Sequence, residues 1–288
     1  MLSQEQIELY RANGYLAVEQ VFNGTEVEEL RRVTDEFVDK SRQVDESDAA
    51  FDLEPGHTAA APQLRRLKSP VLLHEAYKRA LHHDGLLDIV EQLVGPGVRY
   101  NGDKLNMKSG GFGSPVEWHQ DWAFYPHTND DLLAVGVCID DMTVENGCLM
   151  VIPGSHKGKI YDHHLDGRFC GAVTEPDFDD GDAVRIEVPA GGISIHHVRA
   201  LHGSLPNTTP HPRRLLLLQY CAADAYPLVG KGVGSWDDFG ETFLRGDPTP
   251  NIRASDAPIR MPQPPALRGG SIYENQTVLQ ESTFKKVG

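Results

Sequence analysis

The hydrophobic pattern changes once along the chain, near residue 97, and this change limits the folds that the sequence can adopt. Before it, apolar residues recur at the spacing of amphipathic helices. After it, short apolar runs alternate with clusters of Gly, Pro, Asn and Asp, which is typical of strands joined by turns. The sequence therefore predicts a mainly β protein in which N-terminal helices form a layer packed on a double-stranded β-helix, a cupin-like jelly-roll core. The expected strands are residues 98–109, 132–140, 148–152, 183–188, 192–198 and 214–222.

Start signals mark the helices of the N-terminal part. They are the capping boxes Ser3/Gln6 and Thr25/Glu28, Ser69–Pro70 for a helix to about His82, and Asp84 for a helix that ends at Gly95. A short strand is expected at 15–18. Residues 45–63 are acidic and rich in Ala, with Pro and Gly, so we expect a loop, either a disordered insertion or a lid over a site.

We expect a single domain over residues 1–288. Its predicted parts are a helical layer (1–97, with the 45–63 loop), the jelly-roll core (98–224) and a C-terminal wrap (225–288). From about Lys231 onward the chain is rich in Pro, Gly and charge, so the tail should surround the barrel without forming a core of its own.

Charge and composition narrow the classes of partner. The net charge of −15 argues against nucleic acid or an anionic membrane surface as a main partner, because both require a basic face. The 4 cysteines are scattered without zinc-type spacing, and no secretory signal or membrane-spanning apolar stretch is visible. We therefore expect a cytoplasmic protein, monomeric or homodimeric, that acts on a small molecule.

The segment Trp118–Trp122 holds the most informative motif, a histidine and a carboxylate two residues apart. On an extended strand His119 and Asp121 would point to the same side and could share one ion. Imidazole with carboxylate suits a divalent metal such as Fe(II). Alone, an H-x-D is weak evidence in a chain with 13 histidines, since it can equally be a surface His near an Asp.

Two further residues complete a possible site. His202 follows an apolar strand, and Arg213 lies eleven residues beyond it at the start of another apolar run. Two histidines and one carboxylate leave metal positions open for a chelating cosubstrate and dioxygen. An arginine in the same pocket would supply the planar fork that a distal carboxylate requires.

These motifs together resemble those of the phytanoyl-CoA dioxygenase family of Fe(II)- and 2-oxoglutarate-dependent oxygenases. The resemblance runs from about Lys104 to about Tyr220, and the motifs that carry it are 104–108, 119–121 with Tyr125-Pro126, 145–149, 153–158, and 202–204 with Arg213. It implies that His119, Asp121 and His202 are the catalytic iron ligands. It further implies that Arg213 binds the far carboxylate of 2-oxoglutarate with help from Ser204.

The resemblance also implies the reaction. Dioxygen is consumed, 2-oxoglutarate is decarboxylated to succinate and CO2, and a small organic substrate is hydroxylated. Halogenating relatives have a small residue in place of the carboxylate, so Asp121 favours hydroxylation. Open alternatives are desaturation, epimerisation or ring formation at the same iron, a non-catalytic jelly-roll binding module, and a zinc hydrolase on a cupin-like barrel.

Several neighbouring positions compete for roles near the site. Arg214 competes with Arg213, and because adjacent strand residues face opposite ways only one of them can point into the barrel. The eleven-residue spacing that the family resemblance implies selects Arg213, so we expect Arg214 to face solvent. Lys104 and Asn106 could reach the cosubstrate or an anionic substrate, whereas Lys108 is expected on a solvated face. The remaining expectations are Trp122 and Phe124 as substrate-lining residues, His197 as a structural histidine, His196 as ambiguous, and His163 and His164 as residues that could flank the pocket mouth.

Overall fold

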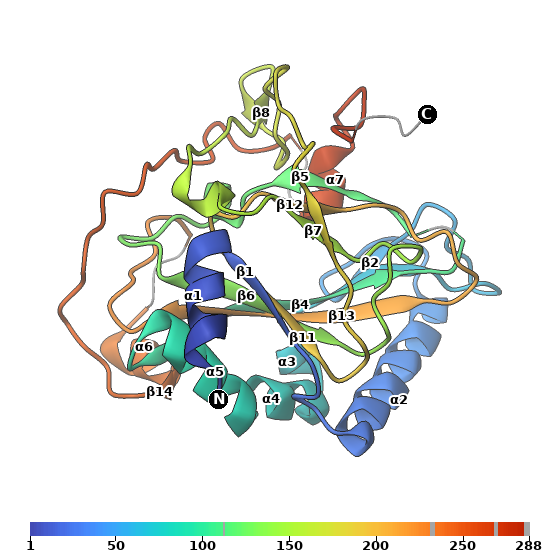
Figure 1. Cartoon of the computed structure of the whole chain (residues 1–288). Coiled ribbons are helices and arrows are strands. Elements are labelled where there is room, and N and C mark those ends of the chain that lie inside the picture. Colours follow the sequence, from blue (N-terminus) through green and yellow to red (C-terminus); the bar gives the residue numbers. More distant parts are fainter. Residues whose placement is uncertain (112, 231–233, 268–269, 285–288) are drawn as a thin grey trace.

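The computed structural model describes residues 1–111, 113–230, 234–267 and 270–284. Two antiparallel sheets lie face to face, with most helices below the larger one in the view of Figure 1. The larger sheet has the order β1-β11-β6-β13-β4-β3-β2, with β14 also paired to β4, and the smaller sheet has the order β10-β7-β12-β5. This arrangement confirms the predicted jelly-roll core with a packed helical layer.

The strands of the larger sheet are β1 (Tyr15–Val18), β2 (Phe51–Leu53), β3 (Leu64–Lys68), β4 (Val98–Lys108), β6 (Leu132–Cys138), β11 (Ile193–His197), β13 (Arg213–Ala222) and β14 (Phe243–Arg245). Those of the smaller sheet are β5 (Val116–His119), β7 (Leu149–Val151), β10 (Val184–Ile186) and β12 (His202–Ser204). A separate hairpin pairs β8 (His164–Leu165) with β9 (Arg168–Phe169).

The helices are α1 (Gln4–Asn13), α2 (Gly24–Lys40), α3 (Pro70–Leu73), α4 (Glu75–Leu81), α5 (Asp84–Val94), α6 (Trp236–Glu241) and α7 (Ile272–Gln276). Short 3-10 turns are η1 (Ser41–Gln43), η2 (Asp121–Ala123) and η3 (Ser155–Lys157). The main hydrophobic core lies between the helical layer and the outer face of the larger sheet, and includes Val33, Leu87, Leu105 and Leu216. A second cluster fills the space between the sheets, with Val151 of β7 and Leu217 of β13 among its members.

Local signals predicted most helix starts. The Ser3/Gln6 capping box begins α1, and Gly14 ends it in the left-handed conformation that glycine adopts without strain. The Thr25/Glu28 prediction was wrong by two residues, because the side chain of Asn23 accepts the N–H groups of Thr25 and Glu26.

The single helix predicted from Ser69 to His82 is two helices. The chain is extended at His74, whose ring then accepts the N–H of Ala76 and caps α4. The helix is therefore interrupted at His74, where a side-chain cap starts a new helix within the predicted segment.

The predicted division into helical and β parts is only approximate. Strands β1, β2 and β3 lie within residues 1–97 and join the larger sheet. Strand β2 falls inside the segment 45–63 that was expected to be a loop, and pairs with β3. In the C-terminal segment, part of which lies outside the described residues, β14 pairs with β4 and α7 contacts β5. The tail therefore supplies structural elements as well as a wrap.

The register of β4 and β13 determines which side chains face the space between the sheets. Arg213 lies opposite Lys108, Leu215 opposite Asn106, and Leu217 opposite Lys104. Because side chains alternate along a strand, these positions share one face and Arg214 lies on the other.

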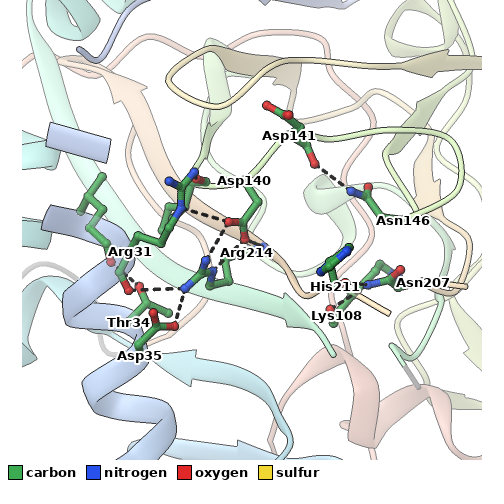
Figure 2. Close-up of polar contacts among 12 residues, drawn as sticks. Arg31, Thr34, Asp35, Lys108, Asp140, Asp141, Asn146, Asn207, His211 and Arg214 are labelled. Carbon is green, nitrogen blue, oxygen red and sulfur yellow. Dashed lines mark hydrogen bonds and ion pairs between the residues drawn. The ribbon is translucent and has the colours of Figure 1, made fainter. Parts of the chain in front are cut away.

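Two predictions of solvent exposure on these strands were wrong. Lys108 is fully buried, and its Nζ donates to the carbonyl oxygens of Ser114 (2.5 Å) and Leu205 (2.8 Å). Arg214 is also buried, because α2 covers that face and its guanidinium pairs with Asp140 and Asp35 (Figure 2). Neither side chain reaches solvent as a free charge.

Candidate metal centre

Three side chains from distant parts of the chain converge between the sheets. His119 ends β5, Asp121 begins η2, and His202 begins β12 directly opposite His119. One ligand atom from each of the three lies within 4.8 Å of the others. All three residues are buried. Within the described residues this is the group whose geometry could hold a metal ion.

Backbone contacts fix which nitrogen of each histidine faces the centre. Nδ1 of His119 lies 2.8 Å from the carbonyl oxygen of Glu117, and Nδ1 of His202 lies 2.9 Å from that of Ala200. Each Nδ1 therefore carries the proton and donates, which leaves the Nε2 lone pair free to bind a metal.

The protonation states also suit a metal centre. Burial lowers the pKa of His119 to about 4, and burial together with the neighbouring histidines lowers the pKa of His202 well below its usual value. Burial opposes ionisation of Asp121, but Lys104 and the surrounding histidines hold the pKa of that carboxyl well below its usual range. Neutral imidazoles and an ionised carboxylate are the ligand forms that bind divalent metals.

The H-x-D pair does not lie on one strand, contrary to the strand-alternation argument. Strand β5 ends at His119, and Asp121 starts a 3-10 turn. The intervening Gln120 holds this turn in place: its N–H donates to Nε2 of His163 (2.9 Å) and its side-chain amide donates to the carbonyls of Lys159 and Arg199. His163 is thus buried behind the site, and does not flank the pocket mouth.

A cavity of about 590 Å³ of empty space, partly open to solvent, adjoins the three ligands. It is also lined by Lys104, Asn106, Ser194, His196, Ser204, Arg213 and Tyr273. The structure thus brings all the polar residues predicted for the cosubstrate to one cavity.

Several buried polar atoms of this cavity have no partner among the described residues. Nη2 of Arg213 donates to the carbonyl of Gly147 (3.1 Å), but its Nε and Nη1 have none. The same holds for the Tyr273 hydroxyl, Asn106 Oδ1 and Ser194 Oγ. Buried polar groups are normally hydrogen-bonded, so this cluster fits a missing polar ligand with acceptor groups, such as the carboxylates of 2-oxoglutarate.

The two aromatic residues predicted to line the substrate pocket differ in what they pack against. Trp122 is fully buried in the main core, its Nε1 donates to the carbonyl of Pro258, and it is absent from the cavity lining. That prediction was wrong, because the indole packs in the main hydrophobic core and its Nε1 is bonded by the C-terminal segment. Phe124 is also absent from the cavity lining, but its ring meets that of His119 edge-on at 5.9 Å between centroids and packs near Tyr273, so its role beside the substrate stays a prediction.

The two histidines of β11 point to opposite sides. His196 lines the cavity with its Nε2 3.4 Å from Oδ2 of Asp121. His197 points away, near the rings of Tyr10 and His156, and its Nδ1 accepts the N–H of Arg199. His196 is therefore the histidine that contacts the ligand set, and His197 is structural as predicted.

Sequence reasoning missed two contributors. Tyr273 and Ile272 reach the cavity from α7, in the tail that was expected only to wrap the barrel. The Ser271/Glu274 capping box was the available signal for this helix. Arg66 of β3 is not among the residues that line the cavity, but it lies on the same face of the sheet as Asn106, which only strand pairing reveals.

Two imidazoles and one carboxylate held in a jelly roll are typical of the non-haem iron oxygenases. The chain belongs to the phytanoyl-CoA dioxygenase (PhyH) family, whose family model matches residues 10–215. The predicted family is thereby confirmed.

Curated relatives agree with this assignment. The chain is 34% identical to a probable alpha-ketoglutarate-dependent hypophosphite dioxygenase of Stutzerimonas stutzeri over 290 residues, which cover 99% of this chain and 100% of that protein. It is 31% identical to the L-proline trans-4-hydroxylase of Streptomyces griseoviridis over 57% of this chain and 80% of the hydroxylase.

Solved structures show the same fold. EctD from S. alaskensis with bound Fe superposes with a TM-score of 0.68 at 25% identity, over 88% of this chain and 87% of that chain. The non-heme alpha ketoglutarate dependent carbocyclase SnoK superposes with a TM-score of 0.67 at 25% identity, over 86% and 93%.

The protein is therefore an Fe(II)- and 2-oxoglutarate-dependent dioxygenase, as the sequence predicted. Its cofactor is iron and its cosubstrate is 2-oxoglutarate. Among the described residues, no helix has the length and apolar character needed to cross a membrane.

Proposed function

We propose that this enzyme hydroxylates a small substrate at an iron held by Nε2 of His119, a carboxylate oxygen of Asp121 and Nε2 of His202. The observation that carries the proposal is the approach of these three ligand atoms to within 4.8 Å in a buried cavity. Iron supplies the activation of dioxygen. The chain's own part is to present neutral imidazoles, to orient both substrates and to exclude water.

We propose that Arg213 and Ser204 bind the distal carboxylate of 2-oxoglutarate. Arg213 offers two buried guanidinium nitrogens, Nε and Nη1, that have no partner among the described residues, and Ser204 is a buried hydroxyl that lines the same cavity. The Tyr273 hydroxyl and Asn106 amide, whose oxygens are also unpartnered, can complete the polar lining around the cosubstrate. A charged, bidentate contact of this kind fixes the orientation of the cosubstrate as well as its affinity.

We propose His196 as a positioning residue for Asp121. Its Nε2 lies 3.4 Å from the Asp121 oxygen, and the centroid of its ring lies 4.1 Å from that of the His202 ring, to which it is tilted by 39°. Contacts to metal ligands from the surrounding shell usually orient those ligands. His196 would therefore hold the carboxylate in the geometry that metal binding requires.

Hypophosphite is the substrate that we would assay first. The relative that carries this name aligns with the chain from end to end at 34% identity. In the balanced reaction, one oxygen atom of O2 enters a P–H bond to give phosphite. The other enters succinate, formed from 2-oxoglutarate with release of CO2.

The test is the substitution His119→Ala, which removes one ligand. Iron-dependent formation of succinate should fall to background, because the two remaining ligands hold the metal weakly. Succinate is measured with and without added Fe(II), and Lys157→Ala on η3 serves as the surface control. Turnover equal to that of the wild-type enzyme in the His119 variant would end the assignment.

We further propose that the 288 residues act as one domain in a reducing cytoplasm, as a monomer or a homodimer. All four cysteines are buried and free, which suits a reducing compartment. Light scattering of the purified protein tests the oligomeric state.

A further inference from the structure

We propose that Arg66 and Lys104 form a binding site for a small anionic group of the substrate, such as a phosphinate, a phosphonate or a carboxylate. This inference rests on the proposed function and names the class of substrate. The observations that support it are the register of β3 and β4, the absence of partners for both cations, and their distance from Arg213.

Strand register places the two cations on the face that bounds the cavity. Lys104 and Asn106 line the cavity from β4. On the neighbouring strand β3, Arg66 lies directly opposite Asn106. Residues opposite one another in an antiparallel pair share a face, so Arg66 points to the same side as Lys104 and Asn106.

Among the described residues, neither cation has a hydrogen-bond or ion-pair partner. Nε of Arg66 is buried and has no acceptor among those residues. Neighbouring cations are satisfied: Arg65 pairs with Asp52 at 3.0 Å, and Nζ of Lys68 donates to the carbonyl of Asp48. In a chain with 42 acidic and 27 basic residues, two adjacent unpaired cations stand out.

The electrostatics show that the two cations are close and incompletely solvated. Burial lowers the pKa of both side chains. Asp121 opposes this shift for Lys104, whereas the charge of Arg66 adds to it. An anion placed between Arg66 and Lys104 would relieve their mutual repulsion and supply the missing acceptors.

Arg66 and Lys104 lie apart from the site proposed for 2-oxoglutarate. In the register of β13 and β4, Arg213 lies opposite Lys108, which is four residues along β4 from Lys104. At the rise of a β-strand this separation is about 13 Å. Asp121 is close enough to Lys104 to raise its pKa, so the metal ligands lie next to the lysine end. The cation pair therefore suits the substrate, and Arg213 suits the far end of the cosubstrate.

The experiment is an anaerobic titration of the enzyme loaded with Fe(II) and 2-oxoglutarate. The absorption band of the iron–2-oxoglutarate complex reports cosubstrate binding, and its change on adding hypophosphite, or separately methylphosphonate, reports the anion. We expect Arg66→Gln and Lys104→Met each to raise the Kd of the anion about 10- to 100-fold, the range for loss of a charged hydrogen bond. The Kd of 2-oxoglutarate should not rise in parallel with it.

Two variants make the result specific. Lys68→Gln removes a positive charge from the same strand, but its ammonium bonds the carbonyl of Asp48, so anion binding should match wild type. Arg66→Lys keeps the charge and should recover part of the affinity. An anion Kd unchanged in Arg66→Gln and Lys104→Met, or a wild-type enzyme that binds neither anion, would overturn the inference.

A thermal-shift assay separates failure of this inference from failure of the proposed function. Stabilisation by hypophosphite does not require the iron chromophore. If the wild-type enzyme does not form the absorption band of the iron–2-oxoglutarate complex, the proposed function is refuted. An equal thermal shift in wild type and Arg66→Gln would refute the anion site alone.

Discussion

Two adjacent arginines on opposite faces of β13 differ in their hydrogen-bond partners. Arg214 faces the helical layer, where its Nε and Nη2 each lie 2.7 Å from an oxygen of Asp140, and its Nη1 bonds Asp35 of α2 (Figure 2). Arg213 faces the cavity with two guanidinium nitrogens that have no partner in the described residues. Both side chains are buried. Burial alone therefore does not distinguish a structural cation from a binding cation; the presence of partners does.

The same contrast recurs on β4. Lys108 and Lys104 share the inner face, but the ammonium of Lys108 bonds two carbonyl oxygens while Lys104 bonds none among the described residues. Leaving a buried charge unpaired costs stability, so an enzyme retains one where a ligand will supply the partner. The inner face thus holds both kinds of cation: Lys108 is bonded by the protein, whereas Lys104 and Arg213 keep donors available for ligands.

The largest effect should follow from Arg213→Met. We expect the KM for 2-oxoglutarate to rise about 30-fold or more, because truncating one side of a buried charge pair costs about 2–5 kcal/mol. The free energy of unfolding without ligand should change little, since the variant loses the hydrogen bond to the Gly147 carbonyl but also removes a buried guanidinium with two nitrogens that lack partners among the described residues. Steady-state succinate formation and urea unfolding measure the two quantities. An unchanged KM would show that another residue anchors the cosubstrate.

The ligand set could be predicted from the sequence because its signals are local. His119 and Asp121 are two residues apart, and the spacing of His202 and Arg213 is readable without a structure. Strand alternation predicted that only one of Arg213 and Arg214 faces the barrel interior, and the spacing from His202 selected Arg213; the structure has Arg213 on the inner face and Arg214 on the outer one. It could not show that α2 covers Arg214, because that contact joins residues far apart in the chain.

The rest of the site depends on long-range pairing. Arg66 comes to the same face of the sheet as Asn106 only through the register of β3 on β4, and Tyr273 reaches the cavity only because α7 packs beside β5. The burial of Lys108 depends on the carbonyls of Ser114 and Leu205, which no periodicity predicts. Residues supplied by short elements with weak patterns were therefore the ones missed.

The second-largest effect should follow from substituting Arg214 on the outer face of β13, and it should be an effect on stability. Arg214→Met should lower the free energy of unfolding by about 3 kcal/mol, because it leaves the carboxylate of Asp140 without its bidentate partner. The KM for 2-oxoglutarate should stay at the wild-type value. Urea unfolding and initial rates provide both readings, and the double variant Arg214→Met/Asp140→Leu should regain part of the lost stability. A raised KM without loss of stability would reverse the roles assigned to the two arginines.

The smallest effect on stability should follow from removing the more exposed ion pair of Arg214, the one with Asp35. The Asp35 side chain is 67% exposed, against 16% for Asp140, although both pair with Arg214. Solvent screens an exposed pair, so Asp35→Asn should cost only about 0.5 kcal/mol, whereas Asp140→Asn should cost several times more. Urea unfolding of both variants, with Asp39→Asn on the same helix as a surface control, measures the ratio. Equal losses for Asp35 and Asp140 would mean that α2 is held to the sheet mainly through its exposed pair, and that the buried fork adds little.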